Sequence, residues 1–304
     1  MSNYEVDFLQ DQTQWFEPFV SKVTGSKAWL DGMAEAAAAN NVSVQYCMAH
    51  PAAFLNALSL PAVTNGRASG DYQAPSGNLL QYGANAPFFA AVGIAPSKDN
   101  WQSIADQPPR RSQSPEGAPA CDGGSRNASA NFLHALVATL STGPVGFSDA
   151  LGFNNATLIQ ATCASDGLLL KPSLPLAAVD RSFCRSLSGP EAACGAPGRP
   201  PLPPHGQIWA THTAAAGNVW YYALGIAAVP GALSGAKLLR TDLYPPLSPE
   251  ADVVVWEHCD PATATLVKGS KDGGSAGVLT AMDTAASSDG DFKYVVVSPV
   301  PAPY

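Results

Sequence analysis

The sequence predicts an α/β region followed by an all-β region, and three observations support this division. Over about the first 180 residues, strand-like and helix-like segments alternate. A stretch rich in Pro and Gly follows at 186–206. Beyond it, short aromatic and β-branched runs are separated by turn residues. The first pattern is typical of parallel βα units, and the last is typical of an antiparallel sandwich of about 100 residues.

Each element of the α/β region follows from its local residues. Ser26 is the expected N-cap of a helix rich in alanine, and Pro51 suits the first turn of another helix. The polar segment 103–129, with many Pro, Gly and Ser residues, is expected to be a long surface loop. Strands are expected at 4–9, 42–48, 62–69 and 143–148, a short strand or turn at 93–98, and helices at 26–40, 51–58, 84–92, 130–141 and 154–164.

The all-β region begins after the expected linker at 186–206. Its strands are expected at 207–213, 219–225, 252–257 and 291–298, where Val, Ile, Tyr and Trp are frequent. No helical pattern lies between them. The chain therefore divides into 1–185, the linker 186–206 and the β domain 207–304.

Composition excludes several classes of function. The chain of 304 residues is 46% hydrophobic and has a net charge of −8, so we expect no nucleic-acid partner. Its apolar runs are too short to span a bilayer, and no charged segment followed by an apolar one marks a signal peptide, so the compartment stays open. The spacing of His and Cys residues predicts no metal site, and without phosphate-binding glycine motifs nucleotide binding has no support. Cys184 and Cys194 flank a short loop and either form a disulfide or remain thiols.

Several chemistry-bearing residues fall at the carboxyl ends of the expected parallel strands, where active sites of such folds lie. They are Asp7, Cys47 with Met48, Asp71, Asp99 and Asp149. Asp7 and Asp71 are 64 residues apart, which corresponds to two βα units. Two carboxylates on either side of a sugar are what a glycosidase requires. The plainer interpretation is that Asp7 caps a strand end and that Asp71 is a turn aspartate.

Four segments resemble the α-galactosidase (melibiase) superfamily of glycoside hydrolases, in the order found there. YEVDFLQ (4–10) resembles the strand that carries the nucleophile, and GRASGDY (66–72) resembles the acid/base segment. QYCM (45–48) is similar to the fifth barrel strand, and LHALVATLSTGPVGFSDALG (133–152) to the last barrel helix and eighth strand. The resemblance implies that 1–185 is the C-terminal half of a (β/α)8 TIM barrel, strands 4–8, followed by a C-terminal antiparallel β-sandwich domain.

The resemblance also implies roles for individual residues. Asp7 would be the nucleophile and Asp71 the general acid/base, while Arg67 would bind sugar hydroxyls or orient Asp71. The residues expected to contact the carbohydrate substrate are Arg67, Gln45, Tyr72, Lys98, Asp99 and Trp101. No Cys lies near Asp7 in the sequence to pair with Cys47, which is expected to be a buried free thiol.

The implied activity is that of a retaining glycoside hydrolase acting on α-linked sugars, which requires no cofactor. Because the superfamily carries its nucleophile on the fourth barrel strand, we expect this chain to be the back part of a longer enzyme. Two alternatives remain open. One is a catalytically inactive carbohydrate-binding protein or pseudoenzyme fragment, and the other is a transglycosylase similar to raffinose synthase.

Overall fold

The computed structural model describes residues 2–22, 24–70, 76–104, 107, 131–183, 206–227, 233–258, 260–270, 277–283 and 292–300. Several sequence predictions lie outside these ranges. They are Asp71 and Tyr72, Cys184 and Cys194, most of the expected loop 103–129, and the expected linker except Gly206.

The α/β region contains a four-stranded parallel sheet, as the sequence predicts. Its strands are β1 (Ser2–Val6), β2 (Val42–Tyr46), β3 (Val63–Arg67) and β4 (Ala95–Ser97), and they lie side by side in chain order. Helices α3 (Gly25–Ala39), α4 (Pro51–Ala57) and α5 (Ser76–Ala91) connect successive strands. Right-handed connections between strands in chain order place such helices on one face of the sheet. The same strand order occurs within (β/α)8 barrels.

The helix-covered face of the sheet is apolar. Val44 and Tyr46 of β2 are completely buried, and Phe54 of α4 lies in the same core. A Cβ atom at Gly66 of β3 would meet the rings of Phe54 and Phe89, at 2.6 and 2.7 Å. Glycine therefore lets the two helices approach β3 closely, and alternate residues of each strand point to the opposite face.

Other parts of the α/β region differ from the sequence prediction. Helices α1 (Leu9–Trp15) and α2 (Glu17–Val20) were not expected, and Thr24 rather than Ser26 precedes α3. Helix α6 (Asn131–Leu140) matches its expected range closely, whereas α7 (Ala156–Gln160) is short.

The strand expected at 143–148 was wrong, because the segment forms only one isolated parallel bridge, from Phe147 to Trp101. Its Gly143 N–H donates to the Pro96 carbonyl at 2.8 Å. Pro144 next to it has no N–H with which to continue a strand ladder.

The second region is antiparallel, as predicted. A six-stranded sheet has the order β10-β9-β12-β7-β6-β5, and β8 (Lys237–Leu239) pairs with β11 (Val278–Ala281) in a smaller sheet. Leu238 and Leu279 of the smaller sheet share a core with Val253 and Val297 of the larger one. The larger sheet contains β5 (Ala177–Ala178), β6 (Gly206–Ala215), β7 (Asn218–Ala227), β9 (Val253–Glu257), β10 (Asp260–Val267) and β12 (Phe292–Pro299).

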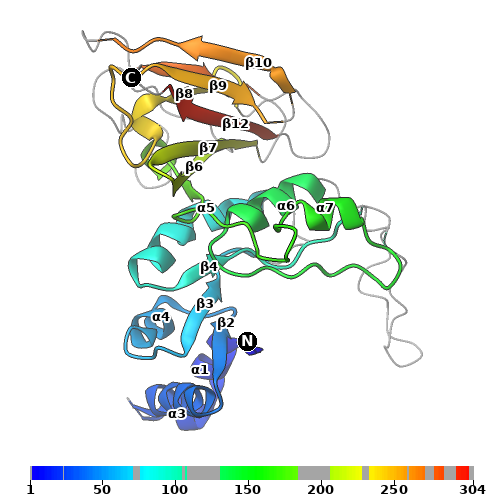
Figure 1. Ribbon diagram of the computed structural model, residues 1–304. Helices are drawn as coiled ribbons and strands as arrows, with labels where there is room; N and C mark the ends of the chain where they lie inside the picture. Colours follow the sequence, from blue (N-terminus) through cyan, green and yellow to red (C-terminus); the bar gives the residue numbers. More distant parts are fainter. Residues whose placement is uncertain are drawn as a thin grey trace.

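Helices of the α/β region pack against the antiparallel region. Figure 1 shows α5, α6 and α7 between the parallel sheet and the antiparallel sheets. Trp209 of β6 is completely buried, and its ring centroid lies 5.7 Å from that of Tyr82 on α5. The core around α5 therefore continues into the six-stranded sheet. Among the described residues, no helix has the length and apolar character needed to cross a membrane.

Candidate active site

The face of the parallel sheet opposite the helices is polar. In the register of β1 and β2, Asn3 lies beside Ser43 and Glu5 lies beside Gln45. Gln45 also pairs with Asn65 of β3. The Asn65 side-chain N–H donates to Gln45 Oε1 at 2.6 Å, and Asn3 donates to the same oxygen at 3.3 Å. Gln45, a predicted substrate contact, is thus held by amides from the strands on both sides.

Asp7 directly follows β1, at the carboxyl end of this polar face. Its side chain is exposed, and its Oδ1 accepts the backbone N–H of Phe8 at 2.8 Å. Phe8 has a positive φ of 53°, where the chain turns from the strand into α1. Gln12 of α1 donates from its side chain to the Asp7 carbonyl at 3.0 Å. The turn therefore fixes the backbone of Asp7 and orients one carboxylate oxygen.

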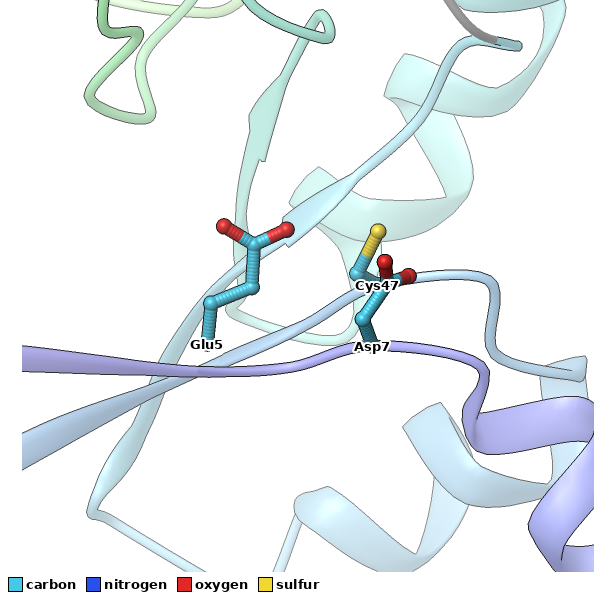
Figure 2. Close-up of side chains that lie close together, drawn as sticks. All are labelled: Glu5, Asp7 and Cys47. Atoms are coloured by element: carbon cyan, nitrogen blue, oxygen red, sulfur yellow. The ribbon is translucent and has the colours of Figure 1, made fainter. Parts of the chain in front are cut away.

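Glu5 and Cys47 lie beside Asp7, and Figure 2 shows the three side chains on the same side of their strands. One carboxylate oxygen of each acid and the Cys47 sulfur all lie within 4.8 Å of one another. Cys47 is 1% exposed. Burial, and next the hydrogen-bonding interaction with Asp7, raise the pKa of the Cys47 thiol, while the charge of Arg67 acts in the opposite direction.

This cluster has the ligand types of a metal site, but its chemistry does not favour one. A thiol must lose its proton to bind a divalent metal, and the raised pKa of Cys47 opposes that step. Without a thiolate, the exposed carboxylates of Glu5 and Asp7 would be the only ligands left in this cluster. The cluster is better described as a carboxylate pair with a protonated thiol beneath it.

Arg67 and Asp99 extend the site along the strand ends. Arg67 is the last residue of β3, and its Nη1 lies 3.6 Å from Asp99 Oδ1. The Asp99 backbone N–H donates to Ser69 Oγ at 2.9 Å, which ties the segment after β4 to the segment after β3. Arg67 at the end of β3 and Asp99 after β4 thus lie at the ends of paired strands, at the same edge of the sheet as Asp7 after β1.

Two predicted substrate contacts do not lie on this face. Lys98 is 3% exposed, and its ammonium donates to the carbonyls of Asp99 and Asn100 at 2.6 and 2.7 Å. Trp101 is 2% exposed and packs against Ala135 of α6. Lys98 therefore holds the backbone around Asp99, and Trp101 is part of a small core.

The burial of Lys98 predicts a pH-dependent stability. Burial lowers the pKa of Lys98 from 10.5 to about 7, although Asp99 opposes the shift. Between these values the unfolded chain binds a proton that the folded chain lacks, so the free energy of unfolding rises with pH. We expect Lys98→Met to reduce this slope by up to about 1.4 kcal/mol per pH unit.

Urea unfolding at several values from pH 7 to 9.5 measures that slope. Lys27→Met is the control, because the Lys27 side chain is 55% exposed and pairs with Asp31 on the helix surface. Its slope should equal that of the original chain. An unchanged slope in Lys98→Met would contradict the proposed effect of burial.

Three further points concern predicted residues that lie elsewhere and one residue that was not predicted. Asp71 and Tyr72 lie outside the described residues, immediately after Gly70. Asp149 accepts hydrogen bonds from the Ser103 backbone and side chain and from Gln107, so it holds a loop together. Glu5 belongs to the site but was not predicted, although the alternation of Asn3, Glu5 and Asp7 along one strand was the signal for it.

The site thus combines exposed carboxylates, an arginine and side-chain amides at the polar face of a parallel sheet. Comparison with known proteins adds no assignment, because no protein-family model matches the chain and no curated protein matches it. The structure shows the architecture alone, a parallel α/β region followed by an antiparallel β region of six plus two strands.

Proposed function

We propose that this protein is a retaining glycoside hydrolase acting on α-linked sugars, with Asp7 as nucleophile and Asp71 as general acid/base. The observation that carries the proposal is the exposed Asp7 carboxylate at the carboxyl end of β1. It shares the polar face of the sheet with Gln45 and lies close to Glu5 and Cys47. The resemblance of YEVDFLQ and GRASGDY to the α-galactosidase superfamily supports the same assignment.

The proposed reaction proceeds in two displacements. An Asp7 oxygen attacks the anomeric carbon while the glycosidic C–O bond breaks, and Asp71 gives its proton to the leaving oxygen. Asp71, now a carboxylate, then removes a proton from water. The water oxygen attacks the anomeric carbon, the bond to Asp7 breaks, and the sugar leaves with its original configuration.

The neighbouring polar groups suit recognition of a sugar. Arg67 offers several N–H donors and Asp99 offers carboxylate acceptors, and the two side chains are only 11% and 15% exposed. Together they would hydrogen-bond hydroxyl groups of a neutral substrate. The Phe8 N–H would keep the Asp7 carboxylate in one orientation during the attack.

A panel of nitrophenyl α-glycosides tests the proposal. The chain, and the product of any reading frame that extends it upstream, would be assayed for nitrophenol release, with the anomeric form of the released sugar followed by NMR. We expect hydrolysis with retention for at least one α-glycoside. Transfer of the sugar to an added acceptor would instead favour a transglycosylase, and binding without turnover a carbohydrate-binding protein. The absence of both binding and turnover would contradict a role in sugar chemistry.

A further inference from the structure

We propose that Cys47 is a positioning residue whose S–H group donates to the Asp7 carboxylate and holds it in its reactive orientation. The catalytic consequence rests on the proposed function, whereas the interaction itself does not. Cys47 directly follows β2 and Asp7 directly follows β1, and these parallel strands pair through Val6 and Tyr46. The Cys47 N–H also donates to the Val6 carbonyl at 3.0 Å, so the two residues are held side by side.

The thiol lies on the same side of the sheet as the carboxylates. In Figure 2 the Cys47 sulfur and the carboxylates of Asp7 and Glu5 all extend to the same side of their strands. The sulfur and one oxygen from each acid lie within 4.8 Å of one another. The thiol therefore lies beneath two exposed acceptors, and it is itself shielded from water.

The surroundings of Cys47 favour its protonated thiol, which is the form that can donate a hydrogen bond. Burial and the two nearby acids each raise the pKa of Cys47, and the opposing charge of Arg67 does not cancel them. A protonated thiol donates one hydrogen bond, whereas a thiolate would repel Asp7. These effects favour the protonated form of Cys47, which can donate to Asp7.

Other roles for Cys47 fit less well. Of the cysteines in the described ranges, Cys47 and Cys163 are free thiols. A nucleophilic or metal-binding role requires a thiolate, which the raised pKa disfavours. A hydrogen bond to an ionised carboxylate, in contrast, stabilises that ion and limits its rotation.

The direct test is the pKa of Asp7, measured from its carboxyl carbon by NMR in a Glu5→Gln background. That background removes the neighbouring acid, so that Asp7 titrates alone. Cys47→Ala and the similarly sized Cys47→Val both remove the donor, and we expect each to raise the Asp7 pKa by about 0.5 to 1 unit. Cys47→Ser keeps a donor and should keep the Asp7 pKa at or below its original value.

Cys163→Ala is the matched control, because Cys163 is partly exposed and its sulfur interacts with the Gln160 carbonyl. It should leave the Asp7 pKa unchanged. An unchanged pKa in both Cys47→Ala and Cys47→Val would overturn the inference, as would equal shifts in the Ser and Ala variants. Because the titration requires no turnover, a shift in a protein that hydrolyses no glycoside would support the thiol interaction and reject the proposed function.

Discussion

Replacing Asp7 with asparagine is expected to reduce the rate of hydrolysis of aryl α-glycosides by a factor on the order of 10⁴ or more. Asparagine has nearly the same shape, and its side-chain oxygen can still accept the Phe8 N–H that Asp7 accepts at 2.8 Å. An amide is nevertheless a poor nucleophile, so no glycosyl-enzyme forms. Nitrophenol release under saturating substrate measures the effect, and circular dichroism checks that the variant is folded.

Asp166→Asn is the matched control. Asp166 is also exposed, and its Oδ1 accepts a backbone N–H, that of Leu168, at 3.0 Å, but it lies outside the polar face. This variant should retain the original rate. Equal losses in the two variants, or no loss in Asp7→Asn, would contradict the assignment of Asp7.

A chemical rescue separates a nucleophile from a residue that only supports the fold. In Asp7→Gly, added azide can occupy the position of the carboxylate and attack the anomeric carbon. The C–N bond forms as the bond to the aryl oxygen breaks, and the product is the β-glycosyl azide, inverted relative to the substrate. Formation of this azide would identify the position of the nucleophile.

The second large effect concerns stability. Asp242→Asn is expected to lower the free energy of unfolding by about 3–5 kcal/mol, because it removes the negative charge that lies against the buried Arg181 guanidinium. The two side chains are only 3% and 2% exposed. Arg181 donates to both carboxylate oxygens of Asp242, at 2.9 and 2.6 Å. Asp242 also accepts the Leu239 N–H of β8, so the pair joins the segment after β5 to the smaller sheet.

Urea unfolding of the whole chain measures this loss. Glu257→Gln is the control. Glu257 Oε1 lies 2.8 Å from Lys293 Nζ, and the Glu257 side chain is 47% exposed and that of Lys293 19%. Solvent screens such a pair, so the expected loss is much smaller. Similar losses in the two variants would indicate that burial of the Arg181–Asp242 pair does not matter.

Much of the fold was predictable because local periodicity determines it. Alanine-rich and amphipathic segments formed the helices α3 and α6, and β-branched runs formed β2, β7 and β12. The strand expected at 143–148 failed where a glycine and a proline break the ladder. Helices α1 and α2 were not expected; with 7 and 4 residues they are too short to show a helical period in the sequence.

The candidate site was predictable only in part. The sequence placed Asp7 near the carboxyl end of a strand expected at 4–9, and the observed β1 ends at Val6, just before Asp7. The carboxyl ends of parallel strands meet at one edge of a sheet. The sequence did not indicate in which direction the side chains after β4 point. Asp99 faces Arg67, whereas Lys98, its neighbour in the chain, is buried with its ammonium on backbone carbonyls.

By itself, then, the sequence determined the parallel α/β region, the antiparallel region after it and the position of Asp7 at a strand end. These depend on patterns within a few residues, such as alternation along a strand. Only the tertiary structure decided that Glu5, Asp7 and Cys47 form one cluster and that Arg67 pairs with Asp99. Proximity between strands depends on register and packing across dozens of intervening residues, and no local pattern contains that information.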